Sequence, residues 1–235
     1  MKRLSAQVMV FAILFLVFLI VLVFFRFPFG PYPLMSVQDA VDLITPLVLL
    51  PLYFLMYRSV SKSGLDLKGL VILAIFAAFW SAGQGMHLSA NSISNLMENS
   101  GAASGDIYKL THFYDEILSH YFWHAGIIGL SALLIYKQSK NPFTDGKATL
   151  WLIVSGAVLY GFTFFLIIME GNTAPLGVTF AVLATLFLII WVRKDLRRQP
   201  LSAFFLTSYA LATLLFLIWG IINGGLPPIM DVIKI

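Results

Sequence analysis

The residues best suited to chemistry gather in one short segment of the chain. His112, Glu116, His120 and His124 recur at every fourth position, so on a helix they form one polar stripe with Asp115 on its flank. Two histidines one helical turn apart can bind a single divalent ion. A third imidazole from another helix would complete a three-histidine site with one coordination position left open for water. The spacing therefore predicts a metal centre near the beginning of this helix.

The third imidazole is expected from His87, which belongs to a different apolar segment. Counting about 1.5 Å per residue along each helix places the rings of His87, His120 and His124 at one level in the same half of the membrane. Other side chains near that level could act as direct or supporting ligands, and these are Asp42, Asn91 and Glu170. The candidate ligands thus come from several separate segments.

The residue types limit the metal and its chemistry. The chain has no cysteine, so nitrogen and oxygen must supply most of the ligands, which favours Zn²⁺ and leaves iron or copper as alternatives. Zn²⁺ lowers the pKa of a bound water molecule to ~7, and a nearby carboxylate can take up the released proton. We expect Glu116 or Asp115 to be this general base.

Composition indicates that the chain lies in a membrane. Of its 235 residues, 60% are hydrophobic and 11% are charged, and the mean hydropathy is +0.91. A water-soluble domain of this size does not have such values. The net charge of +4 does not indicate nucleic acid, because the basic residues lie between apolar runs and form no patch interleaved with aromatic residues. Composition therefore excludes a soluble partner-binding module and a nucleic-acid partner.

The hydropathy pattern predicts an all-α bundle of about seven transmembrane helices in a single domain over residues 1–235. The first apolar run follows Lys2 and Arg3, is too long for the hydrophobic region of a signal peptide, and is followed by no small-residue cleavage site. We therefore expect it to be an uncleaved first span. The predicted spans are residues 8–26, 38–57, 69–91, 110–136, 149–170, 175–193 and 202–222.

The charged residues predict the orientation of this bundle. If the N-terminus is cytoplasmic, the only basic residues on the opposite side are Arg26, Lys109 and Lys234. The only acidic residues on the cytoplasmic side are then Asp66, Asp145 and Asp195. The positive-inside rule thus predicts a cytoplasmic N-terminus, an external C-terminus and histidines that face the extracytoplasmic side. The cytoplasmic basic residues would be Lys2, Arg3, Arg58, Lys62, Lys68, Lys137, Lys140, Lys147, Arg193, Lys194, Arg197 and Arg198.

Two local features modify this outline. Residues Ser92–Asp106 are rich in serine, asparagine, glycine and alanine, which predicts a polar loop outside the membrane. Pro46 and Pro51 remove backbone donors inside the second span and predict a bend there.

The three candidate ligands resemble those of the membrane hydrolase group that includes alkaline ceramidases and adiponectin receptors. That group has seven spans, three zinc-binding histidines and an HxxxH pair. Here His120 and His124 lie in the fourth predicted span instead of the last, and Gly83 stands where that group has a serine four residues before its first histidine. The resemblance covers only the three histidines, so it implies similar chemistry and not membership.

These observations favour a metal-dependent membrane enzyme that hydrolyses a lipid or another apolar small molecule with metal-activated water. Aromatic residues beside the histidines, such as Tyr121 and Phe122, suit a substrate that enters from lipid. One alternative is an oxidoreductase with a di-iron, copper or haem centre. Another is a transporter or receptor in which the buried acids and histidines relay protons or bind an ion. The oligomeric state stays open.

Overall fold

The computed structural model is helical, and it describes residues 1–25, 27–61, 64, 66–192, 196 and 198–233. Within these residues, 7 helices are long and apolar enough to cross a membrane, which confirms the prediction of an all-α bundle with about seven spans. Large apolar side chains such as Leu47, Leu183 and Ile221 are exposed on these helices, as expected for surfaces in contact with lipid. The seven helices cover Lys2–Val21, Val37–Val60, Leu67–Asn99, Gly105–Lys140, Leu150–Glu170, Ala174–Trp191 and Pro200–Asn223.

Most of these spans are single α-helices, and some include a π-helical or 3-10 segment. The α-helices are α1 (Lys2–Leu16), α2 (Val37–Val60), α3 (Leu67–Asn99), α4 (Gly105–His112), α5 (Ser119–Lys140), α6 (Leu150–Glu170), α7 (Ala174–Phe187), α8 (Pro200–Asn223) and α9 (Ile229–Ile233). The π-helical segments are Val17–Val21, Phe113–Leu118 and Leu188–Val192, and Leu22–Phe24 is a 3-10 turn.

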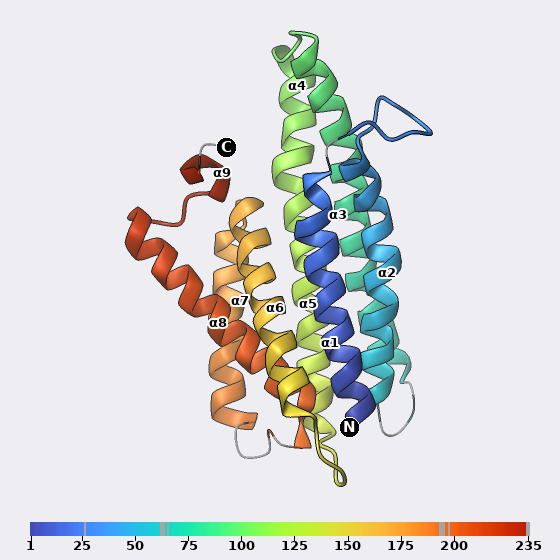
Figure 1. Ribbon diagram of the computed structural model, residues 1–235, viewed down its shortest axis with the longest axis vertical. Helices are drawn as coiled ribbons and strands as arrows, with labels where there is room; N and C mark the ends of the chain where they lie inside the picture. Colours follow the sequence, from blue (N-terminus) through green and yellow to red (C-terminus); the bar gives the residue numbers. More distant parts are fainter. Residues whose placement is uncertain (26, 62–63, 65, 193–195, 197, 234–235) are drawn as a thin grey trace.

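The helices form two groups that pack side by side. Figure 1 shows α1, α2, α3 and α5 on one side of the molecule and α6, α7 and α8 on the other. The helices α3 and α5 pack against each other most extensively. Figure 1 shows that α3, and the span in which α4 leads into α5, extend beyond the other spans at one end of the molecule. This end is termed the α4 end, and the opposite end, where the chain begins, is termed the N-terminal end.

Glycines let α3 and α5 approach closely. A Cβ on Gly83 would lie 2.4 Å from the backbone nitrogen of Trp123, and a Cβ on Gly126 would lie 2.6 Å from that of Trp80. Small residues at these positions are needed for backbones to pack at this distance in a membrane. Gly83 is one helical turn before His87, so the close packing brings His87 next to α5.

A chain of buried hydroxyl groups links the two groups of helices. The hydroxyl of Tyr53 in α2 lies 3.2 Å from Ser131 Oγ in α5. The hydroxyl of Tyr160 in α6 lies 3.0 Å from Ser131 Oγ and 3.2 Å from the hydroxyl of Tyr209 in α8. All four side chains are fully buried. In a membrane the hydrophobic effect does not drive helices together, because lipid tails are as apolar as the side chains. Hydrogen bonds between helices are therefore an expected source of stability.

The prediction of a loop over Ser92–Asp106 is wrong for most of that segment, because α3 continues to Asn99. Ile93, Leu96 and Met97 recur at helical spacing, which outweighs the polar composition of the segment. The helix ends at Gly101, which has a left-handed φ of 72°. The amide of Ala102 then donates to the carbonyl of Met97 over 2.8 Å, as in a Schellman motif.

The two prolines of the second span lie inside a continuous helix. Pro46 and Pro51 are both internal to α2. Since proline has no amide hydrogen, Pro46 cannot donate to the carbonyl of Asp42 one turn earlier. The bend expected at these residues stays a prediction.

Asp66 joins three elements at the N-terminal end. Its carboxylate accepts from the amide of Gly69 over 2.7 Å and so caps α3, and it accepts from the hydroxyl of Tyr57 over 2.9 Å. It also forms an ion pair with Lys137 of α5. The Lys137 ammonium, followed by the Gly69 amide and the Tyr57 hydroxyl, holds the pKa of Asp66 well below its usual value.

The predicted orientation of the bundle depends partly on residues outside the described part of the chain. Lys2, Lys137 and Lys140 belong to helix ends at the N-terminal end of the molecule (Figure 1). Which end faces the cytoplasm stays a prediction. The charged residues that lie outside the described residues are Arg26, Lys62, Arg193, Lys194, Asp195, Arg197 and Lys234.

Candidate metal centre

Three imidazoles converge between α3 and α5. The ring centroids of His87 and His120 are 5.0 Å apart, and those of His120 and His124 are 5.9 Å apart. His120 is 1% exposed and His124 is 0% exposed. The prediction that these rings from two spans share one level is therefore confirmed.

Asp42 orients the ring of His87. Asp42 Oδ2 accepts from His87 Nδ1 over 2.7 Å, and Asp42 Oδ1 accepts from Gln84 Nε2 over 3.4 Å. Gln84 is itself held by Trp80, whose Nε1 donates to Gln84 Oε1 over 2.7 Å. Because an ionised carboxylate only accepts, this contact places a proton on Nδ1 of His87.

The other two imidazoles are oriented in the same way. Nδ1 of His120 donates to the main-chain carbonyl of Glu116 over 2.9 Å. Nδ1 of His124 lies 2.6 Å from Thr173 Oγ1, and the Thr173 hydroxyl can donate in turn to the carbonyl of Ile168 over 3.5 Å. The carbonyl of Glu116 can only accept, so it places a proton on Nδ1 of His120, whereas the hydroxyl of Thr173 can either donate or accept. His120 therefore has its lone pair on Nε2, the state in which a histidine binds a metal, and His124 has the same state when Thr173 accepts from its Nδ1.

Some buried nitrogen and oxygen atoms of the histidine cluster have no hydrogen-bond partner among the described residues. Nε2 of His120 and Nε2 of His124 are buried and have no hydrogen-bond partner among the described residues. Oδ1 of Asp115, a residue 2% exposed, is also buried without such a partner, and it lies 3.7 Å from Nε2 of His87. A buried acceptor without a partner costs about 1–3 kcal/mol. A cation bound between these atoms, or a water molecule that donates to them, would satisfy these acceptors.

A π-helical turn decides which carboxylate enters this cluster. Residues Phe113–Leu118 are π-helical, and the amide of Ser119 donates to the carbonyl of Tyr114 five residues earlier. Asp115 is buried within this segment, and its Oδ1 lies 3.7 Å from Nε2 of His87. Glu116, which α-helical spacing places on the histidine stripe, has an exposed side chain, and it contributes its main-chain carbonyl to the cluster.

The connection between α6 and α7 packs against the two histidines of α5. A Cβ on Gly171 would lie 2.7 Å from His124 Cε1 and 3.0 Å from His120 Cγ, so only glycine fits against these rings. Glu170 Oε2 lies 4.0 Å from His120 Nε2, and this side chain is 50% exposed. Thr173, which precedes α7, is fully buried. The connection thus supplies both the partner of His124 and a carboxylate at the edge of the cluster.

Asn91, a predicted ligand, and His112, the first histidine of the stripe, both lie outside the cluster. Asn91 is one turn beyond His87 on α3, and its Nδ2 donates to Asp39 Oδ1 over 2.7 Å. His112 is exposed, and its ring stacks on Tyr108 with a centroid distance of 5.8 Å. Neither contacts the other imidazoles in the described structure.

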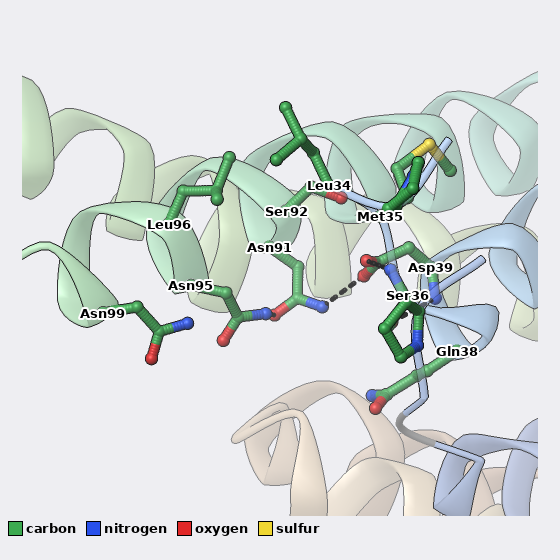
Figure 2. A pocket seen from close by; sticks show the side chains of 12 residues that line it. Leu34, Met35, Ser36, Gln38, Asp39, Asn91, Ser92, Asn95, Leu96 and Asn99 are labelled. Atoms are coloured by element: carbon green, nitrogen blue, oxygen red, sulfur yellow. Dashed lines mark hydrogen bonds between the residues drawn. The ribbon is translucent and has the colours of Figure 1, made fainter. Parts of the chain in front are cut away.

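Beside this cluster, towards the α4 end, lies a cavity of about 430 Å³. It is formed by α2, α3 and the loop before α2. Figure 2 shows Asn91, Asn95 and Asn99 in a row along α3, with Asp39 and Gln38 from the start of α2 beyond Asn91. Its lining residues are Pro28, Pro33, Leu34, Met35, Ser36, Gln38, Asp39, Asn91, Ser92, Asn95, Leu96 and Asn99.

Some supporting residues could not be identified from the sequence. Gln84 could have been noticed, because it lies three residues before His87 and so on nearly the same helix face. Thr173 and Gly171 had no local signal, because their partner His124 is 49 residues from Thr173 in the chain. Contacts of this kind arise only when separate helices pack.

The atoms of the cluster are of the kinds that bind a metal ion. They lie farther apart than ligands of one metal ion do. In the part of the chain that the structure describes, no group of three or more histidine or acidic side chains has the spacing that holds a metal. Zn²⁺–nitrogen bonds of about 2.0–2.1 Å would draw the three Nε2 atoms closer together. The three imidazoles are ligands that suit Zn²⁺, and the carboxylate of Asp115 lies beside them.

Comparison of the chain with models of protein families, with curated proteins and with solved structures finds no match. The function is therefore inferred from the geometry of the cluster.

Proposed function

We propose that this protein is a metal-dependent membrane hydrolase that acts on a lipid or another apolar substrate, with Zn²⁺ as the favoured ion. The metal would be held by Nε2 of His87, His120 and His124. The observation that supports this most directly is the shared orientation of the rings, because each Nδ1 bonds to an oxygen and each Nε2 is left to bind elsewhere. This is the usual arrangement of histidines that bind a metal.

Each neighbouring residue has a role in this proposal. Asp42 and Thr173 fix the rings of His87 and His124, so they are positioning residues. A bound Zn²⁺ would supply a water molecule of lowered pKa. Asp115, whose Oδ1 is buried and unpartnered among the described residues, would take the proton from that water. Glu170, half-exposed at the edge of the cluster, would be the second acidic group near the substrate.

The surroundings of the cluster support a substrate that comes from lipid. Phe113, Tyr114 and Tyr121 are about 40% exposed next to the buried histidines (42%, 40% and 39%). Exposed aromatic side chains at this depth are typical of the interface between lipid and water. The distribution of basic residues favours an extracytoplasmic position for the cluster.

Elemental analysis of protein purified without added metal tests this proposal. We expect stoichiometric zinc in the wild type and in His112→Ala, which removes a histidine outside the cluster. We expect loss of zinc in His120→Ala and in the more conservative His124→Gln. A thermal melt of each variant in detergent shows whether it is folded. The proposal is overturned if the wild type binds no metal, or if a folded His120→Ala or His124→Gln variant retains its zinc. Iron, copper or a coloured protein would also overturn it, because Zn²⁺ has no visible absorption.

A further inference from the structure

The cavity beside the histidine cluster is lined by amide side chains in a regular row. Asn91, Asn95 and Asn99 follow one another at every fourth residue of α3 and so share one helix face. Asn95 Nδ2 donates to Asn91 Oδ1 over 3.1 Å, and Asn91 Nδ2 donates to Asp39 Oδ1 over 2.7 Å. Figure 2 shows this row along the side of the cavity.

Several polar groups of the cavity have no partner within the described part of the chain. The side-chain amides of Gln38, which is half-buried in α2, and of Asn99, which is exposed at the end of α3, make no hydrogen bond there. The hydroxyl oxygen of Ser92 is buried and also has no hydrogen-bond partner. Each amide can both donate and accept, and so can the hydroxyl. A ligand that matches them must offer several groups that also donate and accept.

The charge of the cavity narrows the choice of ligand further. No lysine or arginine is among its lining residues, so a phosphate would find no cation to bind. The carboxylate oxygens of Asp39 already accept hydrogen bonds, Oδ1 from Asn91 and Oδ2 from the amide of Ser36. The cavity therefore disfavours anions and suits the hydroxyl groups of an uncharged molecule.

The cavity and the histidine cluster share the same two helices. Asp39 is one turn from Asp42 on α2, and Asn91 is one turn from His87 on α3, about 6 Å along the axis. The hydrogen bonds Asp39–Asn91 and Asp42–His87 thus form two successive links between α2 and α3. A group bound in the cavity would lie about one helical turn from the proposed metal.

We propose that this cavity binds an uncharged, hydroxyl-rich group, a sugar or polyol, carried as the headgroup of the lipid substrate. The inference rests on the proposed function, because it assigns the substrate class of the same site. The headgroup would contact Gln38, Asn95 and Asn99, and the acyl chains would remain in lipid with the bond to be cleaved near the histidines.

Binding of a fluorescent glucosyl diacylglycerol to the full chain in nanodiscs tests this inference. Glucoside and maltoside detergents must be absent, since they carry the same headgroup. We expect unlabelled glucosyl diacylglycerol to displace the probe, and we expect phosphatidylglycerol and free methyl glucoside to displace it at least about tenfold less well. Gln38→Ala combined with Asn99→Ala should weaken probe binding roughly tenfold. The matched control is Asn223→Ala at the end of α8, outside the cavity, which should leave binding unchanged.

The outcomes separate this inference from the proposed function. Equal displacement by phosphatidylglycerol, or unchanged binding in the double variant, overturns the inference even if zinc is present. Equal displacement by methyl glucoside overturns the assignment to a lipid. Selective glucosyl-lipid binding that the double variant loses supports the cavity assignment. Measured zinc content in the same samples then shows independently whether the metal centre exists.

Discussion

Nδ1 of His87 lies 2.7 Å from Oδ2 of Asp42, a residue 45 positions away in the chain. This contact joins α2 to α3, places the proton of the imidazole on Nδ1, and leaves Nε2 directed to bind on its other side. A carboxylate behind a histidine is a common way to fix and strengthen a metal ligand. The contact therefore connects the packing of two helices with the chemistry proposed for the cluster.

Replacing Asp42 tests this positioning role. We expect Asp42→Asn to weaken zinc binding by about 10- to 100-fold, because the neutral amide no longer holds the Nδ1 proton of His87 as strongly. The measurement is competition for zinc against a chromophoric chelator. Asp39→Asn is the matched control, since Asp39 is one turn away and bonds to Asn91. An equal loss of affinity in both variants would argue that Asp42 acts only on stability.

Asp115 is expected to act in the reaction more than in metal binding. Asp115→Asn should retain zinc but lose hydrolysis by at least about 10²-fold, the usual contribution of a general base. Because the substrate is unidentified, the assay uses proteoliposomes of total lipid extract in ¹⁸O-labelled water, with mass spectrometry of the labelled products. Glu116→Gln should retain both zinc and hydrolysis, because Glu116 contributes only its main-chain carbonyl. Loss of activity in Glu116→Gln with retention in Asp115→Asn would reverse the assignment.

A methyl group on Gly171 should disturb the cluster directly. Its Cβ would lie 2.7 Å from His124 and 3.0 Å from His120, and overpacking of this kind costs about 1–3 kcal/mol. We expect Gly171→Ala to lower both the zinc content and the melting temperature. Gly85→Ala is the control, because a Cβ there meets nothing within 4 Å. Full zinc content in Gly171→Ala would show that the α6–α7 connection does not define the metal centre.

The lowered pKa of Asp66, at the N-terminal end of the molecule, predicts how the stability of the protein depends on pH. Its pKa is lower in the folded protein than in the unfolded chain, chiefly because of Lys137. Its contribution to stability is therefore complete above the unfolded pKa of about 3.9 and is lost as the pH falls towards the lower folded value. We expect Asp66→Asn to melt below the wild type at neutral pH.

The difference in melting temperature should shrink as the pH falls below about 4. An asparagine side chain can also cap a helix, so the Asp66→Asn variant keeps the cap of α3 and isolates the effect of the charge. Asp145→Asn, at an exposed acid that accepts one hydrogen bond from the described residues, that of Thr144, should melt like the wild type at each pH. A difference between Asp66→Asn and the wild type that is independent of pH would exclude this linkage.

Some of the site could be predicted from local sequence. The four-residue spacing of His120 and His124 predicts a pair on one helix face, because α-helical hydrogen bonds repeat at nearly that interval. The depth of His87 in its own span predicts a level shared with that pair. The structure confirms both expectations, since the rings lie 5.0 and 5.9 Å apart.

The sequence by itself determined the number of spans and the half of the bundle that holds the histidines, because apolar length and helical periodicity are local properties. Only the tertiary structure distinguished the two acidic candidates, because Asp115 is buried beside His87 whereas the side chain of Glu116 in the same π-helical segment is exposed. Only packing decided that Thr173 and Gly171 contact His124. Those contacts depend on how closely separate helices approach, and no local pattern in the chain encodes that distance.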